Sequence, residues 1–227
     1  RLNAYSADDA FYTTLRPRLS LGARLPWKFS TQISYVATQQ FLHLLSNNTG
    51  LPTDLWLSST EQIEPQTGWQ TTVKISRSLG NVQISLEGFY RKMADVVAFR
   101  PGSIWYSTPD WQEQIIQGEG EAYGVELFVQ KDIGRFTGWM SYTWSRSFRR
   151  FDELNFGEKF PFRFNRIHDY SLSVNYQIDE KFSLAGNWIF STGQFLTLPN
   201  TIYNGLLVYQ SIEGPLRWPQ EYYDGRN

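Results

Sequence analysis

The sequence predicts an all-β fold, namely an antiparallel transmembrane β-barrel built as a meander of hairpins with short periplasmic turns and long extracellular loops. Three observations predict it. Apolar and polar residues alternate along about eight segments of about ten residues, the length that a tilted strand needs to cross a bilayer. Short and long connections alternate between these segments. Aromatic residues make up 17% of the chain, and many of them stand at the apolar positions or at segment ends.

The bulk composition excludes several classes of protein. The 227 residues carry a formal net charge of −1, which argues against nucleic-acid binding. The absence of cysteine excludes thiolate metal ligands and disulfides within this sequence. The mean hydropathy of −0.42 is low. It does not exclude a membrane protein, because strands that turn alternate residues to lipid and to a wet lumen average to a neutral value.

The first predicted hairpin shows the alternation most clearly. In residues 15–25 the leucines occupy one set of alternate positions, and Arg16, Arg18 and Arg24 occupy the other. Since alternate residues of a strand point to opposite faces, we expect these three arginines to face the lumen. After the turn at 25–28, residues 29–38 continue the pattern.

Six further segments alternate in the same way, and they pair through equally short turns. The predicted strands are 69–76, 82–87, 123–130, 140–145, 170–176 and 184–190, with turns at 79–81, 132–135 and 178–181. The links between hairpins are long, at 39–66, 93–120, 147–165 and from 193 onward. All of them fall at one end, as in outer-membrane barrels. A soluble β-sandwich or solenoid is the alternative, but it would distribute its long loops over both ends.

Aromatic residues at the strand ends are typical of an interfacial girdle. Trp27 and Trp144 are the best candidates, because an indole ring has an apolar body and a polar N–H that suit the boundary between lipid and water. The alternative is packing against neighbouring strands.

The long loops hold the candidate binding residues. Aromatic side chains of the 93–117 loop suit stacking on sugar rings or on a planar chelate, and basic side chains of the 147–165 loop suit an anionic ligand such as a ferric chelate or lipopolysaccharide phosphates. In the alternative, the loop aromatics pack on one another and the arginines pair with Asp152, Glu153 and Glu158. The predicted ligand-binding residues are Trp105, Tyr106, Trp111, Arg149, Arg150 and Arg163.

Catalysis finds little support in the sequence. The two histidines, His43 and His168, are far apart, and no nucleophile elbow or phosphate-binding glycine loop is present. Two histidines without cysteine also argue against a structural metal site. We therefore expect no enzyme activity, no cofactor and no metal.

Four stretches carry a family pattern. They are Gly118-Glu-Gly-Glu-Ala-Tyr-Gly-Val-Glu-Leu127, Gly134-Arg-Phe-Thr-Gly-Trp-Met-Ser-Tyr-Thr-Trp-Ser145, Phe160-Pro-Phe-Arg-Phe-Asn-Arg-Ile-His-Asp169 and Gln40-Phe-Leu-His-Leu-Leu-Ser46. With these stretches the chain resembles TonB-dependent outer-membrane receptors, especially those of the Bacteroidetes type. Such receptors are barrels of about 22 strands closed by an N-terminal plug. They import large or scarce nutrients, and TonB couples the import to the proton gradient of the inner membrane.

The resemblance implies a function and a set of partners. Residues 1–227 are expected to form one segment of such a barrel in a Gram-negative outer membrane, without the plug domain and the terminal strands. The lumen-facing arginines would then meet acidic groups of the plug. The expected partners are membrane lipid and lipopolysaccharide, the plug, the TonB complex and a surface lipoprotein. An iron chelate, cobalamin, an oligosaccharide and a peptide all remain open as the imported nutrient. The alternatives are a barrel that only anchors structural or adhesive loops, and a soluble β-rich binding module.

Overall fold

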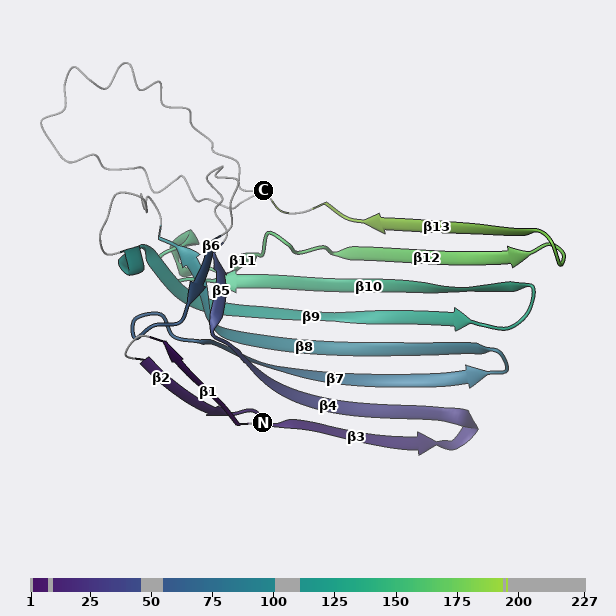
Figure 1. Ribbon diagram of the computed structural model, residues 1–227, viewed down its shortest axis with the longest axis horizontal. Coiled ribbons are helices and arrows are strands. Elements are labelled where there is room, and N and C mark those ends of the chain that lie inside the picture. The colour runs from purple at the N-terminus through teal and green to yellow at the C-terminus, as the bar shows by residue number, and fades with distance from the viewer. Residues whose placement is uncertain (1, 8–9, 46–54, 101–110, 194, 196–227) are drawn as a thin grey trace, which may run out of the picture.

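The computed structural model describes residues 2–7, 10–45, 55–100, 111–193 and 195, and it is built from antiparallel strands (Figure 1). Its main sheet has nine strands, eight of which form an unbroken path in the order β13-β12-β10-β9-β8-β7-β4-β3, while the short β11 pairs with β10. The strands are β3 (Arg18–Leu25), β4 (Phe29–Gln40), β7 (Gln66–Leu79), β8 (Val82–Phe99), β9 (Ile115–Lys131), β10 (Phe136–Arg150), β11 (Phe160–Pro161), β12 (His168–Gln177) and β13 (Ser183–Ser191).

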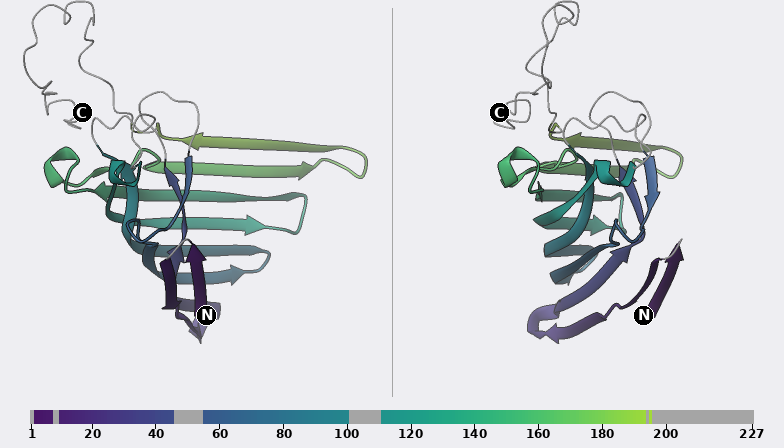
Figure 2. Two further views of the ribbon diagram at one scale, coloured as in Figure 1. Left: turned by 60° about the vertical axis from the view of Figure 1, so that its left-hand side comes forward. Right: turned by 90° about the vertical axis from the view of Figure 1, so that its left-hand side faces the viewer.

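Two small hairpins accompany the main sheet. One joins β1 (Leu2–Ala7) to β2 (Ala10–Leu15), and the other joins β5 (Leu42–Leu45) to β6 (Leu55–Ser58). In the end-on view of Figure 2 both hairpins lie on the same side of the stacked strands. The short 3-10 helices are η1 (Pro26–Lys28), η3 (Trp111–Gln114) and η4 (Asn155–Gly157). Among the described residues, no helix has the length and apolar character needed to cross a membrane.

The predicted meander of antiparallel hairpins is confirmed. Seven of the eight alternating segments lie within strands of the main sheet, and the eighth, 15–25, does so from Arg18 onward because Leu15 ends β2. The four predicted turns join β3 to β4, β7 to β8, β9 to β10 and β12 to β13. All four turns lie at one end of the sheet (Figure 1). Within the described part of the chain the sheet is open, with β3 and β13 at its two edges.

The strands are longer than predicted at the end away from the turns. β8 continues to Phe99, β9 begins at Ile115 and β10 continues to Arg150, so much of the expected loops 93–120 and 147–165 is strand. The expected loop 39–66 contains the hairpin β5–β6. These predictions were wrong because alternation reports which face is apolar, whereas backbone pairing continues where both faces carry polar or mixed side chains.

Register divides the main sheet into two faces of opposite character. Leu21 lies opposite Ile33, which lies opposite Val73, and Leu86 lies opposite Leu127. Their side chains are directed away from the neighbouring polar residues, because successive residues alternate between faces. We call this surface the apolar face. Its exposed members include Leu19, Leu21, Leu25, Ile33, Val73, Ile75, Leu86, Val125, Tyr176, Leu184, Trp188 and Phe190.

An aromatic row borders the apolar face on the side away from the turns. Tyr35 stacks on Trp69 at 6.2 Å between ring centroids, and Trp69 meets Tyr90 at 5.5 Å. Further along the sheet, Tyr123 meets Trp144 at 6.1 Å. The row continues through the ring contacts Tyr142–His168 and Tyr170–Trp188. Trp144 therefore stands on the apolar face, where the sequence predicts it.

The opposite surface, which we call the polar face, is tied together by side-chain hydrogen bonds between strands. The Oγ atoms of Ser30 and Ser76 share a hydrogen bond at 2.7 Å, and Gln32 Nε2 donates to Ser20 Oγ at 2.7 Å. Ser34 and Thr72 also share a hydrogen bond. Such bonds satisfy polar groups but leave most of them accessible, so this face has the chemistry of a wetted surface.

In the described part of the chain, a buried cluster covers the polar face at the end away from the turns, which we call the loop end. A small core forms there from Met93, Val96, Ile116 and Phe151. A β-bulge between Met93 and Val96, with Asp95 at a φ of 59°, inserts one residue into β8. Because the bulge shifts the alternation by one residue, it brings Val96 and not Asp95 to the core side.

The hairpin β5–β6 belongs to a second buried region at the loop end. His43 and Ser59 are almost fully buried, and His43 Nε2 lies 3.0 Å from Ser59 Oγ. Ser59 Oγ donates its own proton to the carbonyl oxygen of Phe41 at 3.1 Å. His43 must therefore donate through Nε2–H, which leaves Nδ1 without a proton. Burial lowers the pKa of His43, so the imidazole is neutral.

Candidate functional site

The candidate site lies at the loop end of the polar face, where β8, β9 and β10 run past the apolar face. Register places Met93 of β8 opposite Gly120 of β9, and Gly120 opposite Arg149 of β10. One row closer to the turns, Arg91 lies opposite Ala122. Because all these positions share the parity of the polar residues, their side chains lie on the polar face.

Glycines in β9 make room for the large side chains of this site. A Cβ on Gly120 would lie 1.9 Å from Arg149 Nη1 and 2.9 Å from Met93 Cε. A Cβ on Gly118 would lie 2.3 Å from the carbonyl oxygen of Arg150 and 2.5 Å from the ring of Phe151. The stretch Gly118-Glu-Gly-Glu-Ala therefore has a physical purpose, because it lets Arg149 and Phe151 lie across the strand.

Arg149 is held between a thioether and an aromatic ring. Its Nη1 lies 3.5 Å from Met93 Sδ, and its Cζ lies 4.3 Å from the centroid of the Phe162 ring. Removal from water, and to a lesser extent the positive charge of Arg91, lower the pKa of Arg149 to about 10. At neutral pH the guanidinium group of Arg149 is therefore charged, and the positive charge of Arg91 acts on it unfavourably.

No carboxylate neutralises these two arginines within the described part of the chain. The ion pairs there are Lys74–Glu87, Arg100–Glu153, Lys159–Glu121 and Arg166–Asp169. In the alternative, loop arginines pair with loop acids. Glu153 does form such an ion pair, with Arg100, whose Nε lies 2.8 Å from Glu153 Oε2. The Met93 sulfur and the Phe162 ring contact the guanidinium of Arg149 without cancelling its charge.

The other predicted binding residues are dispersed. Arg150 ends β10, and its Nε donates to the carbonyl oxygen of Gly157 at 3.0 Å. Arg163 lies over the ring of Phe164 at 4.6 Å. Trp111 begins η3, and Trp105 and Tyr106 lie outside the described residues. The prediction that Arg149 and Arg150 stand in a loop was wrong, because β10 continues through both; their role in binding stays a prediction.

The three arginines predicted to face the lumen have different surroundings. Arg18 and Arg24 occupy polar-face positions of β3 and are exposed. Arg16 lies between β2 and β3 and is 7% exposed. It donates Nη1 to the carbonyl oxygen of Gln39 at 2.9 Å, and its Cζ lies 5.4 Å from the centroid of the Phe41 ring. Its burial by the protein itself argues against direct contact with a ligand.

Sequence reasoning missed Arg91, Met93 and Phe162. A signal for Arg91 was present, because it continues the polar set of β8 that begins at Gln83 and includes Glu87. Met93 and Phe162 had no such signal, since their contacts with Arg149 join β8, β10 and the segment after β11.

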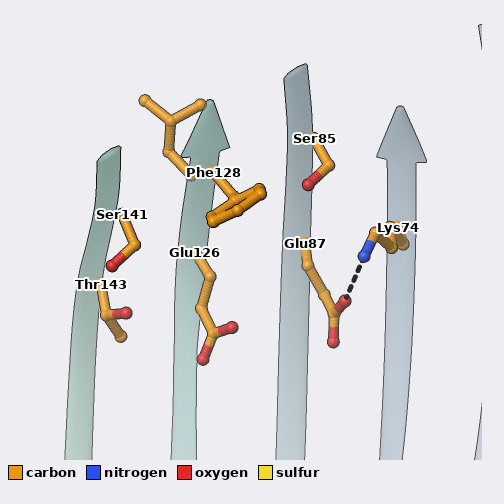
Figure 3. Close-up of a pocket in the computed structure, with 8 residues that line it drawn as sticks. Lys74, Ser85, Glu87, Glu126, Phe128, Ser141 and Thr143 are labelled. Atoms are coloured by element: carbon orange, nitrogen blue, oxygen red, sulfur yellow. Dashed lines mark ion pairs between the residues drawn. The ribbon is translucent and has the colours of Figure 1, made fainter. Parts of the chain in front are cut away.

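A second polar cluster lies further toward the turns on the same face. Figure 3 shows Glu87 and Glu126 side by side, with Lys74 forming an ion pair with Glu87 at 3.8 Å. Ser85, Ser141, Thr143 and the ring of Phe128 complete a shallow hollow of about 270 Å³. Phe128, the aromatic that interrupts the polar set of β9, stacks on Trp139 at 6.3 Å. Two carboxylates and one ammonium group at mid-strand indicate that this face needs water.

Within the described residues there is no group of three or more acidic, histidine or cysteine side chains that could hold a metal ion. Comparison of the chain with family models, with curated proteins and with solved structures finds no match.

Proposed function

We propose that the chain forms part of an outer-membrane β-barrel, with the apolar face toward lipid and the polar face toward the interior of the barrel. The observation that carries the proposal is that an apolar pair and an acidic pair occupy opposite faces of the sheet at the same height. Leu86 (exposed) and Leu127 (half-buried) lie on the apolar face, while Glu87 and Glu126 lie on the polar face. Hydrocarbon on one side and water on the other would satisfy both faces.

The height of the apolar face supports the proposal. In β8 the apolar set runs from Val82 to Tyr90. At about 3.4 Å per residue this distance is about 27 Å along the strand, or about 21 Å at a tilt of about 40°. Outer-membrane barrels have an apolar band of about 25 Å. The aromatic row at one border corresponds to an interfacial girdle.

The turns at the other border carry exposed apolar side chains, which suits the second interface. Trp27 stands in the first turn and is 80% exposed. Ile133 lies in the third turn and Phe182 at the fourth, both also exposed. A ring or alkyl group at each turn would anchor this end in the headgroup region.

The open edges support membership of a larger barrel. β3 and β13 each pair on one side only within the described part. In a bilayer every backbone N–H and C=O needs a partner, so further strands would have to pair with both edges.

For the activity, we propose uptake of a scarce or bulky nutrient through a TonB-dependent receptor. The support is the resemblance of residues 118–127, 134–145, 160–169 and 40–46 to that family, together with the cationic loop end of the polar face. The proposed partners are lipopolysaccharide, a plug domain, the TonB complex and a surface lipoprotein. In this proposal the chain binds and admits a ligand and performs no catalysis.

The membrane orientation is tested by fluorescence quenching with brominated lipid. The protein, as its own gene encodes it, is reconstituted in vesicles and compared with the variants Trp188→Phe and Trp139→Phe. Trp188 stands on the apolar face and Trp139 on the polar face, and both are exposed. We expect Trp188→Phe to lower the quenched fraction and Trp139→Phe to raise it. Equal effects of the two substitutions would exclude this orientation.

The transport activity is tested in cells that express or lack the gene. Uptake of ferric citrate, cyanocobalamin, a maltodextrin mixture and a peptide mixture is measured with and without a protonophore. We expect one of these probes to enter only when the gene is present and the proton gradient is intact. Surface binding of a probe without gradient-dependent entry would favour the anchoring alternative.

A further inference from the structure

We propose that Arg149 and Arg91 bind an oxyanion group, a carboxylate or a phosphate, of the ligand that the barrel takes up. This inference rests on the proposed function and names the chemical class of the ligand. The polar face thereby acquires a defined binding point at its loop end.

The first argument is position. Arg149 and Arg91 come from β10 and β8, and between them β9 presents only Gly120 and Ala122 on the polar face. Because neither of these two residues has a side chain larger than a methyl group, both guanidinium groups approach the same space above β9.

The second argument is charge. Arg149 is half-buried, and its described contacts are the Met93 sulfur, the Phe162 ring and the neighbouring charge of Arg91. A cation partly withdrawn from water without a counter-ion is costly, and a second cation nearby raises that cost. An anion bound between the two arginines would remove both penalties at once.

The third argument is shape. A guanidinium group is planar and offers parallel N–H donors, which match the two oxygens of a carboxylate or phosphate. The Phe162 ring holds the plane of Arg149 from one side. The guanidinium is thus oriented before a ligand arrives, and less conformational entropy is lost on binding.

The fourth argument is the contrast with the middle of the sheet. Glu87 and Glu126 lie on the same face about 14 Å from the level of Arg91, four residues along β8 at about 3.4 Å per residue. This acidic pair repels an anion, so the arginine pair is the part of the face where an anionic group would be held.

Titration calorimetry with citrate and with pyrophosphate tests the inference, using the detergent-solubilised protein at low salt. Citrate represents carboxylates and pyrophosphate represents phosphates, so the two titrations identify which source of oxyanion is preferred. We expect at least one of them to bind, and we expect Arg149→Met and Arg91→Gln each to weaken that binding about tenfold or more. Arg135→Gln is the matched control, because it removes one positive charge from a turn at the other end of β10 and should leave binding unchanged.

Two further measurements keep the result interpretable. Arg149→Lys retains the charge without the planar fork, so we expect it to bind more weakly than the native protein and more tightly than Arg149→Met. Thermal unfolding shows whether each variant is folded, and citrate or pyrophosphate should raise the melting temperature of the native protein but not of Arg149→Met.

The inference is overturned if neither anion binds the folded native protein, or if binding survives unchanged in both Arg149→Met and Arg91→Gln. This failure is distinct from a failure of the proposed function. If only the anion site fails, quenching by brominated lipid and gradient-dependent uptake would still identify a membrane transporter. The ligand of that transporter would then make no oxyanion contact with these two arginines. Conversely, binding of citrate without quenching by brominated lipid would support the anion site and exclude the proposed membrane barrel.

Discussion

Leu86 and Leu127 lie directly opposite each other on β8 and β9, and Leu86 is exposed over 48% of its surface. The residue that follows Leu86 is Glu87, which stands opposite Glu126 on the other face. One face thus carries an apolar cross-strand pair of which Leu86 is exposed and Leu127 half-buried. The other face, one sheet thickness away, carries an acidic pair with an ammonium partner. That separation defines the environments that the two faces need.

The first prediction concerns charge at the centre of the apolar face. Leu86→Arg should lower the free energy of unfolding in a lipid bilayer by about 2–4 kcal/mol, because it places a guanidinium group in hydrocarbon. Gln83→Arg, on the polar face of the same strand, should change it by less than about 0.5 kcal/mol. Denaturant titration of the vesicle-reconstituted protein measures both. Equal stability of the two variants would contradict a lipid-facing Leu86.

The second prediction concerns the close approach at Gly118. Gly118→Ala should destabilise the protein by about 1–3 kcal/mol, because the new methyl group meets the backbone oxygen of Arg150 and the ring of Phe151. Gly88→Ala is the control, since a Cβ at Gly88 meets nothing within 4 Å. Chemical denaturation compares the two variants. A neutral Gly118→Ala would mean that β10 moves aside without cost.

The third prediction is a pH dependence of the hairpin β5–β6. Burial lowers the pKa of His43 in the folded hairpin, so the unfolded hairpin binds the proton more readily. The contribution of neutral His43 to stability is therefore complete above the ordinary histidine value of about 6.5 and is lost as the pH falls below it. Hydrogen exchange at Leu45 and Leu57, which lie in the hydrogen-bonded pairs of the hairpin, should accelerate between about pH 7 and pH 5 after correction for the intrinsic rate.

His43→Gln provides the control for this pH dependence. A glutamine can still donate to Ser59 but does not titrate in this range. The variant should therefore show no acceleration of exchange on acidification. The same acceleration in both proteins would assign the effect to another group.

The fourth prediction concerns the stability of the candidate site in anion-free buffer. Arg149→Met should leave the free energy of unfolding unchanged or raise it by up to about 2 kcal/mol, because a thioether side chain fills the space beside Met93 and Phe162 without a buried charge. Arg135→Gln should have no effect of this kind. Denaturant titration measures both variants. If Arg149→Met lowers the free energy of unfolding by more than about 2 kcal/mol, the native protein already neutralises the charge of the Arg149 guanidinium.

The strands and their pairing could be predicted because alternation is a local property. Leu19, Leu21 and Arg24 already show two faces in the sequence, and the turn at Pro26–Lys28 follows directly. The ends of the strands could not be predicted in this way. Between Met93 and Arg100, and again between Ser145 and Arg150, the side chains meet other parts of the chain on one face and a mixed surface on the other, so the period of two residues disappears while backbone pairing continues.

The candidate site was predictable only in part. Arg149 was identified from its charge and from the arginines around it, but its placement in a loop was wrong. Its partners, Met93, Gly120 and Phe162, are brought to it by three other segments. Contacts of this kind depend on register between strands that are distant in the sequence, and no local pattern specifies them.

The amino-acid sequence by itself determined the antiparallel hairpins, the positions of the tight turns and the division of each strand into an apolar and a polar side, because these follow from neighbours one or two residues apart. Only the tertiary structure decided that the apolar sides of eight strands join into one exposed surface. It also decided that β8, β9 and β10 extend beyond this surface and place Arg149 and Arg91 on the same face, on either side of β9. The physical reason is strand register: a shift by one residue would move every side chain to the opposite face, and the register is set by pairing across the whole sheet.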